Sequence, residues 1–224
     1  MGPRSTAPFL EMVLDECQSR YGARFDMDFP KMVIWSLPTP FYPGKPVDHE
    51  AMNAAILMGL RELAATGVDF ISIPCNTAHI YYEELKEAIG VPLLNIVDET
   101  LRSVPEHCSR PALLATKATM EAGIYQQGLA AAGKTAVLCD QWQGRVDRLL
   151  GSIKAGCNGA SDETEMKALL NEAKEAGADC VIIACTDLTT AALRCGVGLP
   201  VVDSAWCLAR ATVSAYLERM KEQT

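Results

Sequence analysis

The chain has 224 residues, a formal net charge of -8, and a composition that is 49% apolar and 21% charged. This length can bury a hydrophobic core without disulfides, and the composition is typical of a soluble globular protein. The negative charge argues against nucleic acid or an anionic membrane as a partner, because both attract clustered Lys and Arg. No apolar run approaches the ~20 residues of a membrane span and no signal peptide is evident, so we expect a cytoplasmic protein.

Short apolar runs alternate with amphipathic segments along the whole chain. In chain order, strands are predicted at "KMVIWSL" (31–37), "DFISIP" (69–74), "PLLNIV" (92–97), "PALLAT" (111–116), "KTAVLC" (134–139), "DCVIIA" (179–184) and "LPVVD" (199–203). Segments between them, such as 52–66 and 163–176, have apolar residues three and four positions apart, which predicts helices. This alternation is typical of βαβ units, so we expect an α/β fold with parallel sheets flanked by helices.

One segment pattern occurs twice. "LRELAATGVDFISIPC" (60–75) aligns with "LNEAKEAGADCVIIAC" (170–185) at a constant offset of 110 residues, and this places Gly67 over Gly177 and Cys75 over Cys185. Further on, "GVPLLNIVD" resembles "GLPVVDSA". The repeat predicts two pseudo-symmetric lobes, at residues 1–104 and 105–207, with a last helix (208–224) that packs back on the first lobe.

The nine cysteines form no C-x-x-C pair and often lie inside apolar runs, which is typical of reduced intracellular thiols. Most of them, such as Cys139 and Cys180, are expected to be small core residues. None of the three histidines has the spacing that would complete a cysteine site, so no metal site is predicted. His79 lies one helical turn past Cys75, and we expect a histidine with satisfied structural hydrogen bonds there.

Cys75 and Cys185 each lie at the end of a predicted strand. Ligands of open parallel sheets bind outside the carboxyl ends of the strands, so the two thiols are expected to face each other across one cleft between the lobes. Each cysteine also precedes a predicted helix, whose unpaired N–H groups favour a thiolate. Two such groups on opposite sides of a substrate carbon could remove a proton from one face and deliver one to the other.

The segments "PCNTAH" and "ACTDL", together with "MGP", "LLATKATMEAGIYQQGL" and "SIKAG", resemble the aspartate/glutamate racemase superfamily, specifically its aspartate racemase branch. The likeness spans nearly the whole chain. It implies two four-stranded lobes, a mechanism that uses two cysteines and no cofactor, and a homodimer. It also implies a small acidic amino acid, aspartate or glutamate, as the substrate.

The resemblance further implies that Cys75 and Cys185 are the catalytic acid/base pair. The substrate-binding residues that it implies are Met1, Gly2, Pro3, Asn76, Thr77, Thr116, Lys154, Thr186 and Asp187. The first three match a loop that closes over the substrate, and the asparagine and threonines match polar groups that hold its carboxylate and amino groups. Lys154 matches a lysine that receives an acidic side chain, and Asp187 lies where aspartate racemases often have glutamate.

Two departures from the family pattern bear on these expectations. The loop after the first predicted strand usually carries an arginine for the side-chain carboxylate, whereas residues 36–50 offer only Lys45, which lacks the bidentate fork of arginine. Relatives also have a strand before "MGP" that this sequence does not contain.

Two other functional classes fit the same residues. A cis-trans isomerase or decarboxylase of small dicarboxylates would use one thiol as a nucleophile. A small-anion binding protein would use the cleft without catalysis.

Overall fold

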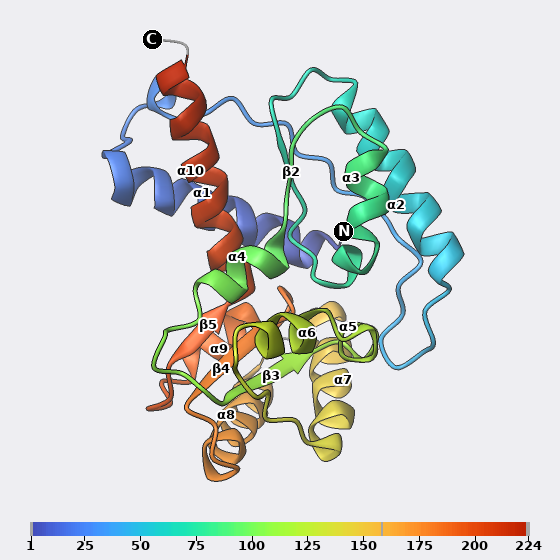
Figure 1. Ribbon diagram of the computed structural model, residues 1–224, viewed down its shortest axis with the longest axis vertical. Coiled ribbons are helices and arrows are strands. Elements are labelled where there is room, and N and C mark those ends of the chain that lie inside the picture. Colours follow the sequence, from blue (N-terminus) through green and yellow to red (C-terminus); the bar gives the residue numbers. More distant parts are fainter. Residues whose placement is uncertain (1, 158, 223–224) are drawn as a thin grey trace.

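The computed structural model describes residues 2–157 and 159–222. In Figure 1 its elements form an upper and a lower half, and α1 begins near their junction. The upper half contains α1 (Pro3–Tyr21), α2 (His49–Ala64), β1 (Ile71–Ser72), α3 (Tyr82–Glu87), β2 (Leu93–Leu94) and α4 (Ile96–Arg102), with short 3-10 helices at Asp26–Asp28 and Thr77–Tyr81. β1 and β2 pair in parallel, with Ile71 opposite Leu93.

The lower half contains β3 (Pro111–Ala115), α5 (Lys117–Ala122), α6 (Ile124–Ala131), α7 (Asp140–Lys154), α8 (Ala160–Glu175), β4 (Cys180–Ala184), α9 (Thr189–Arg194) and β5 (Val201–Asp203). Its sheet is parallel in the order β3-β4-β5. The strand predicted at 134–139 is reduced to one bridge, which joins Val137 to Ala112 of β3. Parallel sheets flanked by helices confirm the predicted α/β fold.

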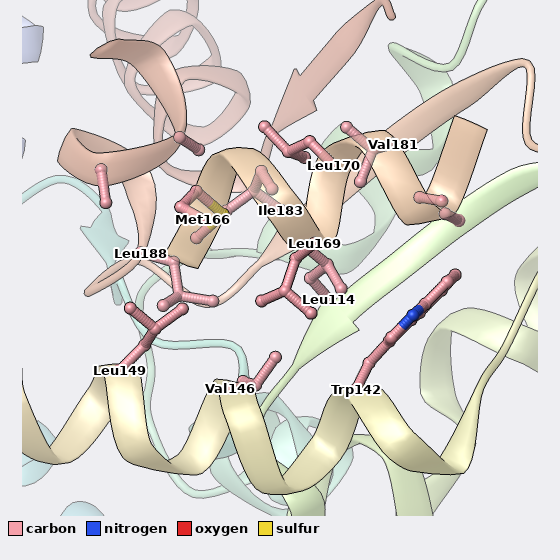
Figure 2. Close-up of a cluster of buried hydrophobic side chains, with 14 of the residues drawn as sticks. Leu114, Trp142, Val146, Leu149, Met166, Leu169, Leu170, Val181, Ile183 and Leu188 are labelled. Carbon is pink, nitrogen blue, oxygen red and sulfur yellow. The ribbon is translucent and has the colours of Figure 1, made fainter. Parts of the chain in front are cut away.

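The lower half has the larger core (Figure 2). Every residue of β3 and β4 is buried, because helices cover the sheet on both faces. Figure 2 shows Trp142, Val146 and Leu149 of α7 facing Leu169 of α8 across Leu114 of β3. Burial of these side chains fixes the position of β4 and of the cysteine that follows it.

The strand predicted at Lys31–Leu37 was wrong, since the segment has no regular secondary structure. The side chains of Met32, Val33, Ile34 and Trp35 are 37% to 53% exposed. An apolar groove of about 420 Å³ is lined by residues 30–35 on one side and residues 66–72 on another. Within the described residues, no backbone hydrogen bond joins this segment to β1. A strand needs a hydrogen-bonded neighbour, and this segment is separated from β1 by the groove.

α10 (Ser204–Glu222) continues directly from β5 and reaches into the upper half, where it packs against α1 and α4 (Figure 1). Its buried Ala205, Ala209 and Val213 contact Met12 and Val13 of α1. The helix starts at Ser204, four residues before the predicted start. The lobe boundaries at residues 104 and 207 stay a prediction.

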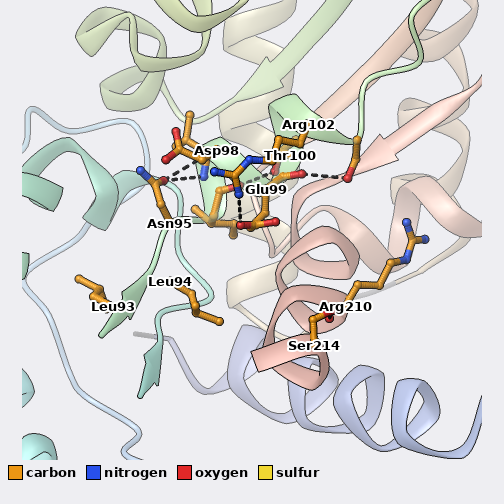
Figure 3. A network of polar contacts seen from close by, with 12 residues as sticks. Leu93, Leu94, Asn95, Asp98, Glu99, Thr100, Arg102, Arg210 and Ser214 are labelled. Atoms are coloured by element: carbon orange, nitrogen blue, oxygen red, sulfur yellow. Dashed lines mark hydrogen bonds and ion pairs between the residues drawn. The ribbon is translucent and has the colours of Figure 1, made fainter. Parts of the chain in front are cut away.

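α4 follows β2 almost directly, and polar contacts hold both of its ends (Figure 3). Asn95 caps the helix, because its Oδ1 accepts hydrogen bonds from the N–H groups of Val97 at 2.9 Å and Asp98 at 3.3 Å. The buried Thr100 donates to the carbonyl of Ile96 at 2.6 Å, and its hydroxyl oxygen lies 3.3 Å from that of Tyr125.

Among the described helices, none combines the length and the apolar composition needed to cross a bilayer.

Candidate active site

A cavity of about 380 Å³ lies where the carboxyl ends of β1 and β4 meet. It is lined by ten of the residues singled out in the sequence, namely Gly2, Pro3, Cys75, Asn76, Thr77, Thr116, Lys154, Cys185, Thr186 and Asp187. Met1 lies outside the described residues. The structure therefore brings both repeated cysteines and all described candidate binding residues to one cleft.

The two cysteines have equivalent positions but different surroundings. Cys75 follows β1 and is half-buried, whereas Cys185 follows β4 and is 6% exposed. Burial raises the pKa of both thiols. A negative charge on Cys75 raises the pKa of Cys185 further, so ionisation of one thiol opposes ionisation of the other. The pair therefore disfavours a state in which both sulfurs are thiolates at once.

The sequence predicted that helix N-termini favour a thiolate at both positions. This prediction was wrong, because burial raises the pKa of both thiols. The N–H of Ala78 lowers the pKa of Cys75 and the N–H of Asp187 lowers that of Cys185, but desolvation is larger in each case. The helical turns that follow are short, with five residues in Thr77–Tyr81 and six in α9. Their dipoles are correspondingly weak.

Hydroxyl groups connect the two halves beside the cysteines. The Thr77 hydroxyl lies 2.9 Å from that of Thr116 and 3.1 Å from that of Thr119. Thr116 is also the N-cap of α5, and Thr186 donates a hydrogen bond to the carbonyl of Pro74 at 3.0 Å. These hydroxyls can rotate to donate to a ligand carboxylate. Thr119 was not singled out in the sequence, and its position three residues after the Thr116 cap is the signal that could have found it.

Asn76 is held by the buried interior. Its Nδ2 donates to Ser204 Oγ at 2.9 Å, and its Oδ1 accepts from the Tyr125 hydroxyl at 2.5 Å. Both ends of the side-chain amide are thus engaged, and Asn76 fixes the direction of the chain immediately after Cys75.

Lys154 and Asp187 form an ion pair at the cavity wall, with 2.7 Å between Nζ and Oδ2. Burial alone would lower the pKa of Lys154, but the Asp187 carboxylate outweighs it and the net shift is upward. The Ser5 hydroxyl donates to Asp187 Oδ1, and the Phe41 ring centroid lies 5.5 Å from Lys154 Nζ. Gly2 lies beside the same nitrogen, and a Cβ atom built on it would be 3.4 Å away, which is ordinary van der Waals contact.

Several lining residues escaped the sequence reasoning. They are Ser5, Ser36, Leu37, Pro38, Thr39, Phe41, Met52, Ile56, Pro74, Ala78 and Ala184. Met52 and Ile56 are four residues apart on the buried face of α2. That periodicity predicted a helix, but which part of the buried face borders a cavity depends on tertiary packing. Lys45 is exposed, does not line the cavity, and lies 5.7 Å from the Tyr42 ring centroid.

His79 has the structural role expected for it. It is 5% exposed, and its Nδ1 lies 2.8 Å from the carbonyl oxygen of Cys75, while its Nε2 accepts from the N–H of Ile96 at 3.2 Å. Burial lowers its pKa, which favours the neutral ring. His79 therefore holds the main chain at Cys75 from behind the cavity.

One group of three potential metal ligands, Cys108, Asp179 and Cys180, lies at the opposite end of β4. The Asp179 carboxylate already accepts hydrogen bonds from the N–H groups of Ser109 at 2.6 Å and Arg110 at 2.9 Å. This carboxylate joins the starts of β3 and β4, and we assign no metal to it.

Comparison with known proteins identifies the family of the chain. Residues 1–212 match the family described as Asp/Glu/Hydantoin racemase. The chain is a member of this racemase family. It is 43% identical over 217 residues to the "Broad specificity amino-acid racemase RacX" of Bacillus subtilis, covering 97% of this chain and 95% of the relative. Its fold matches that of the Picrophilus torridus aspartate racemase with a TM-score of 0.81 at 27% identity, over 96% of this chain and 90% of the other.

A second solved structure shows the same racemase fold. It is an aspartate racemase homologue from Pyrococcus horikoshii, with a TM-score of 0.75 at 22% identity over 95% of this chain and 94% of the other. Family membership agrees with the resemblance found in the sequence.

Proposed function

We propose that this protein is a cofactor-independent amino-acid racemase that interconverts L and D forms, with aspartate and glutamate among its substrates and with Cys75 and Cys185 as its two acid/base groups. One observation carries the proposal: two thiols from equivalent strand ends line one cavity. The names of the relatives support the class of reaction, since they are racemases of amino acids.

The proposed proton transfers follow from the surroundings of the thiols. Burial favours the protonated form of both sulfurs before a substrate binds. The α-ammonium group of a bound amino acid brings a positive charge that favours one thiolate, and the proton of that thiol passes to solvent as the substrate binds. The Lys154 ammonium acts in the same direction on both sulfurs. That thiolate takes the α-proton, the opposite thiol returns a proton to the other face of the carbanion, and the two sulfurs exchange protonation states.

The proposed binding groups are those that surround the sulfurs. We propose that the hydroxyls of Thr77, Thr116 and Thr186 hold the α-carboxylate and that Lys154 meets the side chain, because these residues line the cavity. Gly2 and Pro3, at the start of α1, border the same cavity.

The proposal is tested by incubating single enantiomers of aspartate, glutamate, alanine and serine with the protein in deuterated buffer. Chiral chromatography and mass spectrometry are expected to show inversion with one α-deuterium in each inverted molecule. Hydroxylamine is expected to leave the rate unchanged. A rate that falls with hydroxylamine and returns with pyridoxal phosphate contradicts the proposal.

The same preparation tests the other two functional classes. A dicarboxylate isomerase that uses a nucleophilic thiol is expected to form a covalent adduct with maleate, detected by intact-protein mass spectrometry. A binding protein is expected to bind the amino acids without inverting any of them.

We also propose a homodimer and a cytoplasmic location, as expected from the family resemblance and the sequence. Light scattering after size-exclusion chromatography tests the first, and cell fractionation tests the second.

A further inference from the structure

The two sulfurs differ in how closely their own sheets hold them. Cys185 follows the five-residue β4 directly. β1 has only two residues, and Ile73 and Pro74 separate it from Cys75. Ladder hydrogen bonds fix the chain only within a strand, so the position of Cys75 depends more on contacts outside its sheet.

Asn76, which follows Cys75, makes two of these contacts. Its Nδ2 donates to Ser204 Oγ at 2.9 Å, and its Oδ1 accepts from the Tyr125 hydroxyl at 2.5 Å. All three side chains are at most 2% exposed. Breaking either bond would leave a buried polar atom without its partner, which costs more than the loss of the same bond in water. The Asn76 amide is therefore held in one position.

The two partners of Asn76 belong to firmly packed elements of the lower half. Tyr125 lies in α6 and belongs to a buried cluster with Leu113 of β3 and Ile182 of β4. Ser204 is the first residue of α10 and follows β5 directly. Burial raises the pKa of Tyr125, so its hydroxyl keeps the proton that it donates. The core of the lower half thus sets the position of Asn76.

A third contact holds the chain on the other side of Cys75. Thr186 donates a hydrogen bond to the carbonyl of Pro74 at 3.0 Å. The offset of 110 residues superposes Asn76 on Thr186, so the residues that follow both cysteines help to fix the upper one. Cys75 therefore lies between two residues whose hydrogen bonds lead to the lower half of the molecule.

The direction of the Cys75 side chain depends on these bonds. The N–H of Ala78 lowers the pKa of the thiol, and Asn76 lies in the turn between Cys75 and Ala78. A freely rotating Asn76 would allow this turn, and the sulfur with it, to move away from the N–H. Proton transfer is sensitive to such a movement, because the base has to lie within hydrogen-bond reach of the proton that it removes.

We propose that Tyr125 is a positioning residue for racemisation, which acts through Asn76 and together with Ser204 to hold the Cys75 sulfur at the cleft. This inference rests on the proposed racemase function. Tyr125 and Ser204 are not among the described residues that line the cavity, so their effect on the reaction has to pass through Asn76. The expected signature is an effect on the proton transfer at Cys75 and none on the transfer at Cys185.

The test measures the two sulfurs separately. In Cys185→Ser, exchange of the α-proton of aspartate or alanine with deuterated buffer depends on Cys75, and in Cys75→Ser it depends on Cys185. Tyr125→Phe, which removes only the hydroxyl, is added to each variant. Exchange is expected to fall roughly ten- to hundredfold in the Cys185→Ser background and to stay within about twofold in the Cys75→Ser background. Loss of native structure would instead lower both rates.

Two further variants accompany Tyr125→Phe. Ser204→Ala removes the acceptor at the other end of the Asn76 amide and is expected to act in the same direction. Tyr21→Phe is the matched control: it removes a hydroxyl that donates to the carbonyl of Asp28 at 3.0 Å, away from the cavity, and is expected to leave both exchange rates within about twofold. Equal losses in the two backgrounds, a larger loss where Cys185 is the remaining thiol, or no loss in either overturns the inference.

Alkylation distinguishes failure of this inference from failure of the proposed function. If the wild-type protein inverts no amino acid, the racemase proposal fails; in that case, or if neither single-sulfur variant exchanges, the rates at which iodoacetamide modifies the two cysteines still test Tyr125. Peptide mass spectrometry measures both rates.

Tyr125→Phe is expected to slow modification of Cys75 by about threefold or more, because the thiol loses the N–H that favours its thiolate, and to leave Cys185 within about twofold. Equal changes at the two cysteines, or a rate at Cys75 that stays constant or rises, overturn the inference.

Discussion

The two halves of the molecule contain the same helix, turn, strand and cysteine but support them differently. Gly67 and Gly177 both have positive φ angles, 79° and 82°, in the turn before the strand. In the lower half, β4 has a strand on each side, whereas β1 has β2 on one side and the apolar groove on the other. Equivalent sulfurs, Cys75 and Cys185, are thus held by frameworks of unequal strength.

The repeated aspartates show how each half compensates. Asp179 accepts hydrogen bonds from the N–H groups of Ser109 and Arg110, which lead into β3. Asp69 has no such neighbour in the described chain and forms an ion pair with Arg219 of α10 at 2.8 Å. The lower half thus fixes this aspartate with backbone hydrogen bonds from the chain that leads into β3, whereas the upper half has an exposed ion pair with α10. Two equivalent cysteines therefore do not require equivalent packing around them.

The largest expected effect comes from removing one sulfur at a time. Cys75→Ser and Cys185→Ser are each expected to reduce racemisation by about 10³-fold, because a hydroxyl is too weak an acid to replace a thiol. The remaining thiolate can still exchange the α-proton of the enantiomer that points this proton toward it. In deuterated buffer, the two variants are therefore expected to label opposite enantiomers without inverting them.

Cys157→Ser is the matched control, since Cys157 is exposed and does not line the cavity. It is expected to racemise at the wild-type rate. If Cys75→Ser and Cys185→Ser label the same enantiomer, the sulfurs do not approach the substrate from opposite sides.

The next effect compares the packing of the two strand ends. The repeat pairs Ile73 with Ile183, which are 5% and 0% exposed. Ile183→Ala is expected to lower the free energy of unfolding by about 4 kcal/mol, because the side chain lies between two packed layers. Ile73→Ala is expected to cost about 2 kcal/mol, because Ile73 follows a strand of only two residues and the chain around it can relax into the space more easily. Urea denaturation measures both, and an equal or larger loss at Ile73 contradicts the comparison.

A third comparison concerns the residues that follow the last strand of each half. Asn95 caps α4, and the corresponding Asp203 accepts a hydrogen bond from the N–H of Trp206 at 3.0 Å. Asp203 is 5% exposed, and its Oδ2 has no hydrogen-bond partner among the described residues. Burial raises the pKa of Asp203 to about 6.

Asp203→Asn is therefore expected to stabilise the protein above pH 6 by on the order of 2–3 kcal/mol. The native state holds the Asp203 proton more tightly than the unfolded chain does. The contribution of Asp203 to stability is therefore greatest below about pH 4, falls as the pH rises to about 6, and stays low above it. Thermal unfolding from pH 4 to 8 is expected to show this fall in the wild type and a flatter profile in the variant. Equal pH profiles would contradict the assignment.

Much of the fold could be predicted from the sequence because its signals are local and repeated. Alternation of apolar runs and amphipathic segments indicated the parallel α/β architecture, and the offset of 110 residues located both cysteines at strand ends. The segment 31–37 has the same composition as a strand but is not one. Composition records a preference for pairing, whereas pairing itself depends on a neighbour elsewhere in the chain.

The candidate site could also be predicted only in part from the sequence. Its polar residues were found because they follow the strand ends or match family motifs. The pKa of each thiol could not be predicted, because desolvation depends on everything packed around Cys75 and Cys185 and outweighs the local helix ends. The pairing of Lys154 with Asp187 also joins segments that the sequence separates, and only the folded structure brings them within 2.7 Å.

The exposed segment between Lys31 and Trp35 is also open to proteolytic cleavage. Proteases cut exposed chain that lacks regular hydrogen bonding, and this segment combines exposure with a trypsin site after Lys31. A single early cut there would separate α1 from the rest of the covalent chain. Because α1 packs along α10, the short fragment would stay bound by its apolar face. A nicked molecule would therefore run as two pieces in denaturing gel electrophoresis while keeping its native size on a gel-filtration column.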